Sequence, residues 1–189
     1  MASRRPRAGL AALPRVNTLD RWLRNELRSD HAGETGAVFI YRGILAVSRH
    51  DNLRRFARNH LATEEEHLAL FDYWLEPGDQ SLLIPLWRLS GWLLGVFAAL
   101  GGARFVFLTI DAVEAFVVEH YDQQIERLRE EGEWPEVRLV LEAFQQDEAH
   151  HRVDAIYRAG DRPPGLLESV WRVIVDSGSR LAVLAARLI

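Results

Sequence analysis

Apolar residues recur every three to four positions along most of the chain, and this spacing is typical of helices that bury one face. Firm breaks separate the periodic segments: Glu76-Pro77-Gly78-Asp79 follows the second, and Gly160 with Pro163-Pro164 follows the fourth. No stretch alternates as a strand would. Helices are therefore expected at about residues 17–48, 51–75, 104–131, 134–159 and 165–189.

The segment 82–103 has a different pattern. Residues 89–103 form 15 consecutive positions without a charge, which is shorter than the roughly 18–20 residues needed to span a bilayer. The segment carries Trp87 and Trp92, a residue type that favours membrane interfaces, and several glycines. From the residues alone, two interpretations stay open: a monotopic segment lying in one leaflet, or a crossover helix buried in the protein.

Two Glu-x-x-His motifs, Glu64/His67 and Glu148/His151, supply the candidate chemistry. Residues three apart on a helix share a face, so each carboxylate and imidazole can reach one metal ion. Glu34 lies 30 residues before the first motif and Glu114 lies 34 before the second, about the length of a helical hairpin. The chain is thus an internal repeat of two hairpins with the same ligand pattern.

Four carboxylates in an apolar interior require protons or cations, because an ionised carboxylate is costly to desolvate. Two divalent ions would balance the four negative charges, and the two histidines would add neutral nitrogen donors. Two Glu and two Glu-x-x-His motifs from four helices are the ligand set of ferritin-like di-iron carboxylate bundles. We therefore predict an all-α, ferritin-like four-helix bundle, with the 82–103 segment and a C-terminal helix added to it.

Neighbouring residues offer alternatives to these ligands. Asp147/His150 is a second register on the fourth helix, but Glu148 and His151 continue the apolar stripe and are expected to be the buried pair. His31 and His60 also fall on inward stripes and are expected to be hydrogen-bonded core groups. The remaining neighbours have no assigned ligand role: Glu65 and Glu66, expected in solvent, and Gly33 and Gly36, which indicate either a close neighbour or room for a ligand beside Glu34.

Length and composition narrow the possibilities. A chain of 189 residues is expected to form one domain, here assigned to residues 17–189. The absence of Cys excludes disulfides and thiolate metal sites, leaving the oxygen and nitrogen ligands that suit iron or manganese. The net charge of −4, with mixed signs, gives no reason to propose nucleic acid as a partner. Residues 1–16 are basic and are expected to form a flexible tail that touches anionic lipid.

Four stretches of the chain carry a family resemblance. The first is 30–37, Asp-His-Ala-Gly-Glu-Thr-Gly-Ala, followed by Tyr41; the others are Ile84-Pro85-Leu86-Trp87, then 112–125 with His120-Tyr121, and 147–151. In motif, order and spacing these resemble the demethoxyubiquinone hydroxylases, di-iron monooxygenases of ubiquinone biosynthesis. The resemblance covers about residues 20 to 189.

This resemblance implies a ligand set and a reaction. Its iron ligands would be the six residues reached above: Glu34, Glu64, His67, Glu114, Glu148 and His151. His120 and Tyr121 match a pair that the family is thought to use near the quinone. The sequence departs from the family at Thr35, where an aromatic residue is frequent, and at Ala115, where a second Glu often follows the ligand. The implied activity is hydroxylation of 2-polyprenyl-3-methyl-6-methoxy-1,4-benzoquinol, with two iron ions as cofactor and O2 as co-substrate.

The polyprenyl tail also implies a location and partners. A substrate of this kind enters from lipid, so the resemblance favours membrane docking of residues 82–103 and a peripheral protein on the cytoplasmic face of a bacterial inner membrane. A lipid-binding accessory protein and a homo-oligomer are further possible partners. Two rival functions stay open: a ferritin-like iron-oxidising or peroxide-scavenging protein, and a metal-free helical scaffold at the membrane surface.

Overall fold

Six α-helices and one short 3-10 helix make up the secondary structure of residues 13–188, the part of the chain that this computed structural model describes. Their bounds are η1 Val16–Thr18, α1 Arg21–Val47, α2 Asp51–Trp74, α3 Ile84–Leu100, α4 Ala103–Glu131, α5 Pro135–Ala159 and α6 Leu166–Leu188. The helices expected from the apolar periodicity are therefore confirmed, and the 82–103 segment contains a helix of its own. Within the described range no strand is present.

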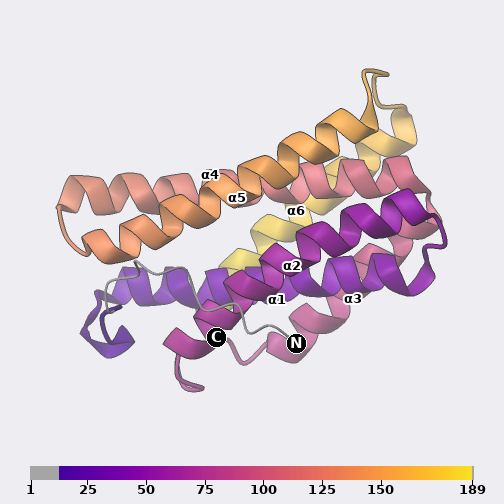
Figure 1. Ribbon diagram of the computed structural model, residues 1–189. Helices are drawn as coiled ribbons and strands as arrows, with labels where there is room; N and C mark the ends of the chain where they lie inside the picture. The colour runs from indigo at the N-terminus through magenta and orange to yellow at the C-terminus, as the bar shows by residue number, and fades with distance from the viewer. Residues whose placement is uncertain (1–12, 189) are drawn as a thin grey trace.

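The bundle consists of two helical hairpins, α1–α2 and α4–α5, which lie in two layers against each other (Figure 1). Short connections at residues 48–50 and 132–134 reverse the chain. At the second of these, Gly132 has a φ of 68°, a left-handed conformation that commonly ends helices and that glycine adopts without the steric cost of a side chain. This hairpin repeat and the all-α bundle confirm the predicted fold class.

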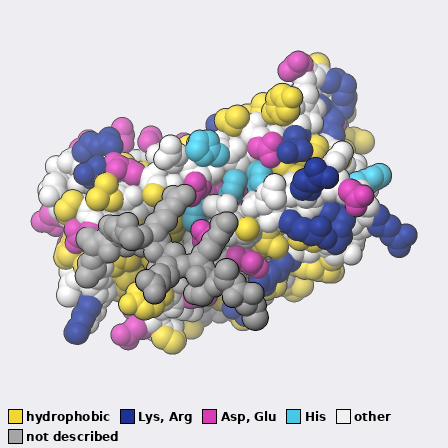
Figure 2. Space-filling model, viewed as in Figure 1, with side chains coloured by type: hydrophobic (Ala, Val, Ile, Leu, Met, Phe, Trp, Pro, Cys, Tyr) yellow, Lys and Arg dark blue, Asp and Glu magenta, His cyan; other side chains and the backbone are white. Residues whose placement is uncertain are grey.

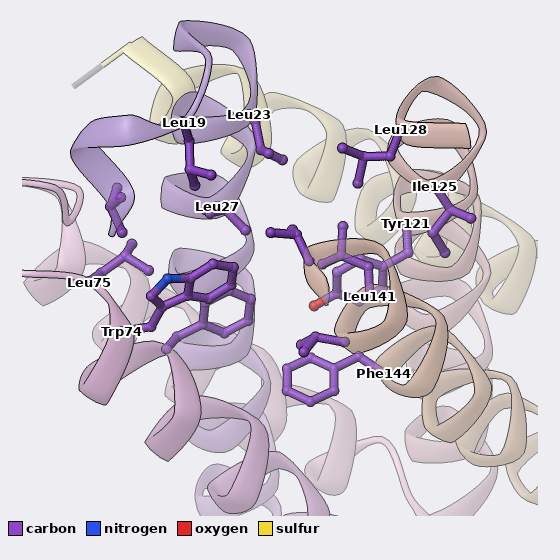
Figure 3. Close-up of a cluster of buried hydrophobic side chains, with 14 residues drawn as sticks. Leu19, Leu23, Leu27, Trp74, Leu75, Tyr121, Ile125, Leu128, Leu141 and Phe144 are labelled. Atoms are coloured by element: carbon purple, nitrogen blue, oxygen red, sulfur yellow. The ribbon is translucent and has the colours of Figure 1, made fainter. Parts of the chain in front are cut away.

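Two apolar clusters fill the space between the hairpins, one on each side of a polar layer. The first core cluster joins all four bundle helices, and its side chains point toward one another (Figure 3). It includes Leu23, Leu27, Phe71, Tyr121, Leu128, Leu141 and Phe144. The second includes Tyr41, Ile44, Phe56, Ala57, Val113 and Ala155. On each helix the predicted metal ligands fall between these two clusters, so the candidate site lies in the middle of the bundle.

Helix α3 lies directly against α1, with glycines where the two backbones meet. A Cβ atom at Gly91 would overlap the carbonyl oxygen of Gly36, and one at Gly95 would overlap the carbonyl oxygen of Ile40. Gly43 on α1 meets the backbone of Trp92 in the same way. The glycines of the 82–103 segment thus permit a close crossing that any side chain would prevent.

Helix α6 packs across α1 and α4 and passes behind the two hairpins in Figure 1. It leaves many large apolar side chains exposed, as α3 does. These are Leu86, Leu89, Trp92, Phe97 and Leu100 on α3, and Leu166, Leu167, Val170, Val173, Ile174, Leu181, Leu184 and Leu188 on α6. We call these residues the α3–α6 face. The side of the molecule seen in Figure 2, by contrast, mixes acidic and basic side chains with scattered apolar ones.

Among residues 13–188, no helix combines the length and the apolar character needed to cross a membrane. Of the predicted N-terminal tail, residues 1–12 lie outside the described residues. Residues 13–16 lie against the bundle: Leu13 packs on the first core cluster, and the carbonyl oxygen of Pro14 accepts a hydrogen bond from Trp74 Nε1 at 2.8 Å.

Candidate metal centre

The four bundle helices bring all six predicted ligands together in the buried middle layer. They are Glu34 from α1, Glu64 and His67 from α2, Glu114 from α4, and Glu148 and His151 from α5. Their ligand atoms fall into two groups, each with all atoms within 4.8 Å of one another: Glu34, Glu64, His67 and Glu148, and Glu64, Glu114, Glu148 and His151. The arrangement therefore offers two adjacent ion positions.

Two carboxylates belong to both groups, and one histidine belongs to each. His67 Nδ1 lies 3.0 Å from Glu148 Oε1 and 3.5 Å from Glu34 Oε2. His151 Nδ1 lies 3.0 Å from Glu64 Oε1 and 3.2 Å from Glu148 Oε2. Glu64 and Glu148 thus stand between the two positions, where a carboxylate can bridge two ions.

The pKa values of the clustered groups show that their negative charge has to be balanced by protons or cations. Burial and the neighbouring charge of Glu148 raise the pKa of Glu64 to about 8, and burial and the same neighbour raise the pKa of Glu114 well above its usual value. Burial lowers the pKa of His151, but hydrogen bonds with Glu148 and Glu64 outweigh it and raise that pKa to about 10. Without metal, protons on these groups must balance the charge of the carboxylates.

Several atoms of the cluster also lack a well-aligned hydrogen bond within the described part of the chain. These buried atoms are both carboxylate oxygens of Glu64, Oε2 of Glu34, Oε1 of Glu148 and Nδ1 of His67, and all but Glu64 Oε2 lie within 3.5 Å of an opposite partner in the cluster. Buried polar atoms are almost always paired, so several poorly satisfied oxygens around one point fit a site built to hold cations. Four carboxylates and two imidazoles form an oxygen and nitrogen donor set that fits iron.

A second layer of side chains holds these groups in place. Asp147 Oδ2 lies 3.3 Å from His67 Nε2, which leaves Nδ1 of that ring for the site. The Tyr121 hydroxyl donates to Glu34 Oε1 at 2.7 Å, and the Tyr41 hydroxyl donates to Glu114 Oε1 at 3.3 Å. Outer partners of this kind fix the orientation of metal ligands.

The other two inward histidines lie outside both groups and are hydrogen-bonded. His60 Nε2 lies 3.0 Å from Asp154 Oδ2, and its ring stacks on that of His151 with the centroids 4.2 Å apart. Burial and the neighbouring His151 lower the pKa of His60 to about 4, which keeps this ring neutral. His31 Nε2 lies 2.9 Å from Asp72 Oδ1.

A cavity of about 360 Å³ leads to the cluster between α1, α3, α4 and α6. Its lining is mostly apolar and includes Ser90 and Ile174, which are exposed at the surface, and the fully buried Glu114. Glu34, Glu64 and Glu148 line it as well, whereas neither His67 nor His151 does. A molecule in this cavity would therefore meet the carboxylate side of the cluster.

The predicted secondary residues, His120 and Tyr121, both line the same cavity. So do Gly33 and Gly36, and a Cβ atom added at either would meet nothing within 4 Å. For Gly33 the structure thus favours room beside Glu34, whereas Gly36 has both free space at its Cβ position and the backbone of α3 close by at Gly91. The sequence did not single out the roles of Asp147 and Tyr41. Their helical spacing relative to the ligands was visible, but the partners that they contact lie on other helices.

Comparison with known proteins supports one family. The model of the family described as ubiquinone biosynthesis protein COQ7 matches residues 21–186. The chain belongs to this family. It is 36% identical over 160 residues to the 3-demethoxyubiquinol 3-hydroxylase of Rhodospirillum rubrum, a match that covers 83% of this chain and 74% of that protein. The family resemblance noted in the sequence is thus confirmed.

Two further relatives show how widely the similarity extends. The 3-demethoxyubiquinol 3-hydroxylase of Bordetella avium is 30% identical over 188 residues, covering 96% of this chain and 86% of that protein. The mitochondrial NADPH-dependent 3-demethoxyubiquinone 3-hydroxylase of Homo sapiens is 30% identical over 164 residues, covering 83% and 73%. Membership of this family makes the chain a hydroxylase, which is an oxidoreductase.

Proposed function

We propose that this protein is a di-iron, O2-dependent monooxygenase that hydroxylates 2-polyprenyl-3-methyl-6-methoxy-1,4-benzoquinol in ubiquinone biosynthesis. The observation that carries the proposal is the convergence of six buried ligand groups at the inner end of an apolar cavity. The names of its relatives, which act on demethoxyubiquinol or demethoxyubiquinone, supply the substrate class.

The residues assigned to the metal are the six of the two groups, with Glu64 and Glu148 shared between the ions. When bound, a pair of iron ions supplies the activation of O2 that a ring hydroxylation requires. In the overall reaction one oxygen atom enters the ring in place of a hydrogen, the other leaves as water, and a reductant supplies two electrons. His67 and His151, on the side away from the cavity, leave the carboxylate side open to the substrate.

The cavity accounts for the binding of a greasy aromatic substrate. Its apolar lining excludes water from the reacting ring, and the glycines at 33 and 36 leave space for that ring beside Glu34. His120 and Tyr121 add polar groups to a wall that is mostly apolar outside the carboxylates, as expected for residues near the quinol.

The α3–α6 face supports entry of the substrate from a membrane. Both helices border the cavity, and both expose large apolar side chains that a lipid surface would cover. We therefore assign the 82–103 segment, together with α6, to docking on the membrane as a peripheral protein, on the cytoplasmic face of a bacterial inner membrane. A lipid-borne tail could then remain in the bilayer while the ring enters the cavity.

The direct test combines metal analysis with turnover. The purified chain, loaded with two iron ions, would be supplied with O2, a reductant and the demethoxyquinol, and the product would be analysed by mass spectrometry. The expected product gains one oxygen atom, and that atom derives from ¹⁸O2 when the labelled gas is used. A two-iron preparation that yields no oxygenated product would contradict the proposal, and iron uptake well beyond two ions per chain would favour the ferritin-like alternative.

A further inference from the structure

The carboxylate of Asp30, on the cavity wall, makes polar contacts with the described residues through only one of its two oxygens. The side chain of Asp30 is fully buried, and the residue lines the cavity one helical turn before Glu34. Gln124 Nε2 donates a hydrogen bond to Asp30 Oδ1 at 2.9 Å, and His120 Nε2 lies 3.0 Å from the same oxygen. Two residues of α4 thus fix the orientation of this α1 carboxylate.

The neighbours of His120 define which partner donates. Its Nδ1 lies 3.4 Å from a guanidinium nitrogen of Arg187, and a guanidinium can only donate. Nδ1 is therefore the acceptor nitrogen, and Nε2 carries the hydrogen; Nε2 forms a hydrogen bond with Ser29 Oγ at 3.3 Å and lies 3.0 Å from Asp30 Oδ1. Arg187 is held in turn by Glu26, at 2.7 Å. The last turn of α6 thereby sets the tautomer of His120, and Asp30 Oδ1 lies beside two N–H groups, those of Gln124 Nε2 and His120 Nε2.

The second oxygen of Asp30 has no such partner. Oδ2 is buried, and no hydrogen bond reaches it from any residue between 13 and 188. On the α3 wall of the same cavity, the indole Nε1 of Trp87 is also buried and unpaired over that range. Since buried polar groups are normally satisfied, the cavity offers one unused acceptor from α1 and one unused donor from α3.

We propose that Asp30 Oδ2 accepts a hydrogen bond from a hydroxyl of the substrate ring while Trp87 Nε1 donates to another ring oxygen, so that the cavity selects the quinol over the quinone. This inference rests on the proposed function. It assigns to Asp30 the distinction between the reduced and the oxidised form of the substrate. A quinol hydroxyl can donate to a carboxylate, whereas a quinone carbonyl carries only lone pairs and would leave Oδ2 unpaired. Sites built to bond a hydroxyl reject analogues that lack it.

Binding measurements without turnover test this selection. The full chain would be loaded with zinc, which has no redox chemistry, and kept free of O2. The probes are the 6-methoxy-3-methyl-1,4-benzoquinol with one isoprene unit at position 2 and the corresponding quinone, titrated by calorimetry. We expect the quinol to bind at least about tenfold more tightly than the quinone, as an unpaired buried carboxylate oxygen implies. Equal affinities, or no binding of either form, would overturn the inference.

Two variants separate the roles of the two groups. Asp30→Asn replaces the acceptor oxygen by an amide of the same shape and is expected to abolish the preference for the quinol, mainly by weakening quinol binding. Trp87→Phe removes the donor and is expected to weaken both forms by a similar factor, because both carry acceptor oxygens. Asp122→Asn, at an exposed position on α4, is the matched control and should leave both affinities unchanged.

Other results with these variants would contradict the role assigned to Asp30. If Asp30→Asn retains its zinc content and melting temperature and keeps the parent's preference, the assignment to Asp30 is wrong. If that variant does not fold, the ratio of affinities in the parent still tests the selection, and Trp87→Phe tests the cavity. Hydroxylation by a protein that binds both forms equally would refute this inference and leave the proposed function standing. Selective binding of the quinol without any turnover would support this inference and contradict the proposed function.

Discussion

Glu64 and Glu148 are the two residues on which the candidate centre depends most. Each belongs to both groups of ligand atoms, and each lies within 3.2 Å of a histidine of the site. The remaining ligands belong to one group only. Removing a shared carboxylate should therefore disturb both ion positions, whereas removing Glu34 or Glu114 should disturb one more than the other.

Glu148→Ala is accordingly expected to bind fewer than about one iron per chain and to lose more than about 99% of hydroxylation, since both ions lose a ligand. Metal content by mass spectrometry and product formation would be measured together. Glu65→Ala is the control, because Glu65 is exposed and pairs with Arg42 at 2.8 Å away from the site. If Glu148→Ala keeps the parent's iron content, the ligand assignment is refuted.

The shifted pKa values of His151, Glu64 and Glu148 predict how the stability of the metal-free protein changes with pH. The folded pKa of His151, about 10, lies above its ordinary 6.5, so the stability it contributes is present below pH 6.5 and is lost as pH rises toward 10. Glu64, with its pKa raised from 4.5 to about 8, acts in the same direction between those values because the unfolded chain releases its proton first. Glu148, with its pKa lowered to about 2, contributes stability above pH 4.5 that is lost only as the pH falls toward 2.

Thermal unfolding of the metal-free protein should therefore occur at a lower temperature at pH 9 than at pH 6, by at least about 5 °C, which corresponds to roughly 1–2 kcal/mol for a domain of this size. Iron(II) added without O2 should reduce this difference, because the ions take the place of the bound protons. Calorimetric scans across the two pH values would check it. A melting temperature that rises with pH in the metal-free protein would contradict the charge assignment.

At the scale of elements, the close crossing of α1 and α3 explains why a helix rich in glycine is stable here. Three glycines remove side chains at the points where the two backbones touch. Each glycine lowers helix stability by about 1 kcal/mol relative to alanine, and the close packing of the two helices offsets this cost. The crossing also places Trp87, Gly91 and Leu94 along the cavity.

Gly95→Ala is expected to destabilise the fold by about 1–3 kcal/mol, because its Cβ atom has no room against the carbonyl oxygen of Ile40. Gly33→Ala serves as the matched comparison: its Cβ atom would meet no neighbour, so the helix should gain up to about 1 kcal/mol. Urea unfolding of both variants and the parent would measure the difference. Similar stabilities for the two alanine variants would show that the crossing is looser than described.

Most elements were predictable from the sequence because a 3.6-residue period locates a helix and its buried face without any knowledge of its neighbours. The six candidate ligands followed from the two Glu-x-x-His motifs and the Glu that lies one hairpin before each, and the apolar period chose the buried register on the fourth helix. Contacts between elements were not predictable in this way. The sequence shows Gly91 and Gly95 but not that α1 covers them, and it does not show that Arg187 reaches Glu26, 161 residues earlier.

Asp30 shows the same limit inside the site. Its place in the family motif was visible, but its partners, His120 and Gln124, come from a helix far along the chain, and only their packing reveals which of its oxygens stays unpaired. The orientation of a side chain depends on the register between helices, which a periodic pattern in one helix does not contain. The chemistry of the cavity wall therefore required the structure.

For the whole molecule, the distribution of apolar surface tests the membrane docking proposed above. Helices α3 and α6 border the cavity, whereas Leu139, an exposed leucine on α5, lies beside Arg138 and three residues before Glu142, which pairs with Arg129 and Arg138. A leucine buried on docking contributes roughly 1.5–3 kcal/mol, so a few of them decide the affinity for a bilayer. The two apolar helices should thus act together.

The double variant Leu89→Ser/Leu184→Ser is expected to bind anionic phospholipid vesicles more than about tenfold more weakly than the parent, because both leucines are over half exposed on this face. Vesicle co-sedimentation would measure the change. Leu139→Ser, which removes a similarly exposed leucine from α5, should bind as the parent does. If Leu139→Ser loses as much binding as the double variant, the docking face has been placed wrongly.

The crossing of α3 on α1 has a consequence for altering the enzyme's substrate range. Because the backbones of α1 and α3 are in contact there, α3 cannot move closer to α1 to widen the cavity. The space available to an aromatic ring is therefore fixed on the side of α3. Helix α6 contributes Gly178 and Ala182 to the lining, and its own packing leaves much of that helix uncovered. Laboratory evolution toward bulkier rings should therefore accumulate its changes on α6 and leave the glycines of α3 untouched.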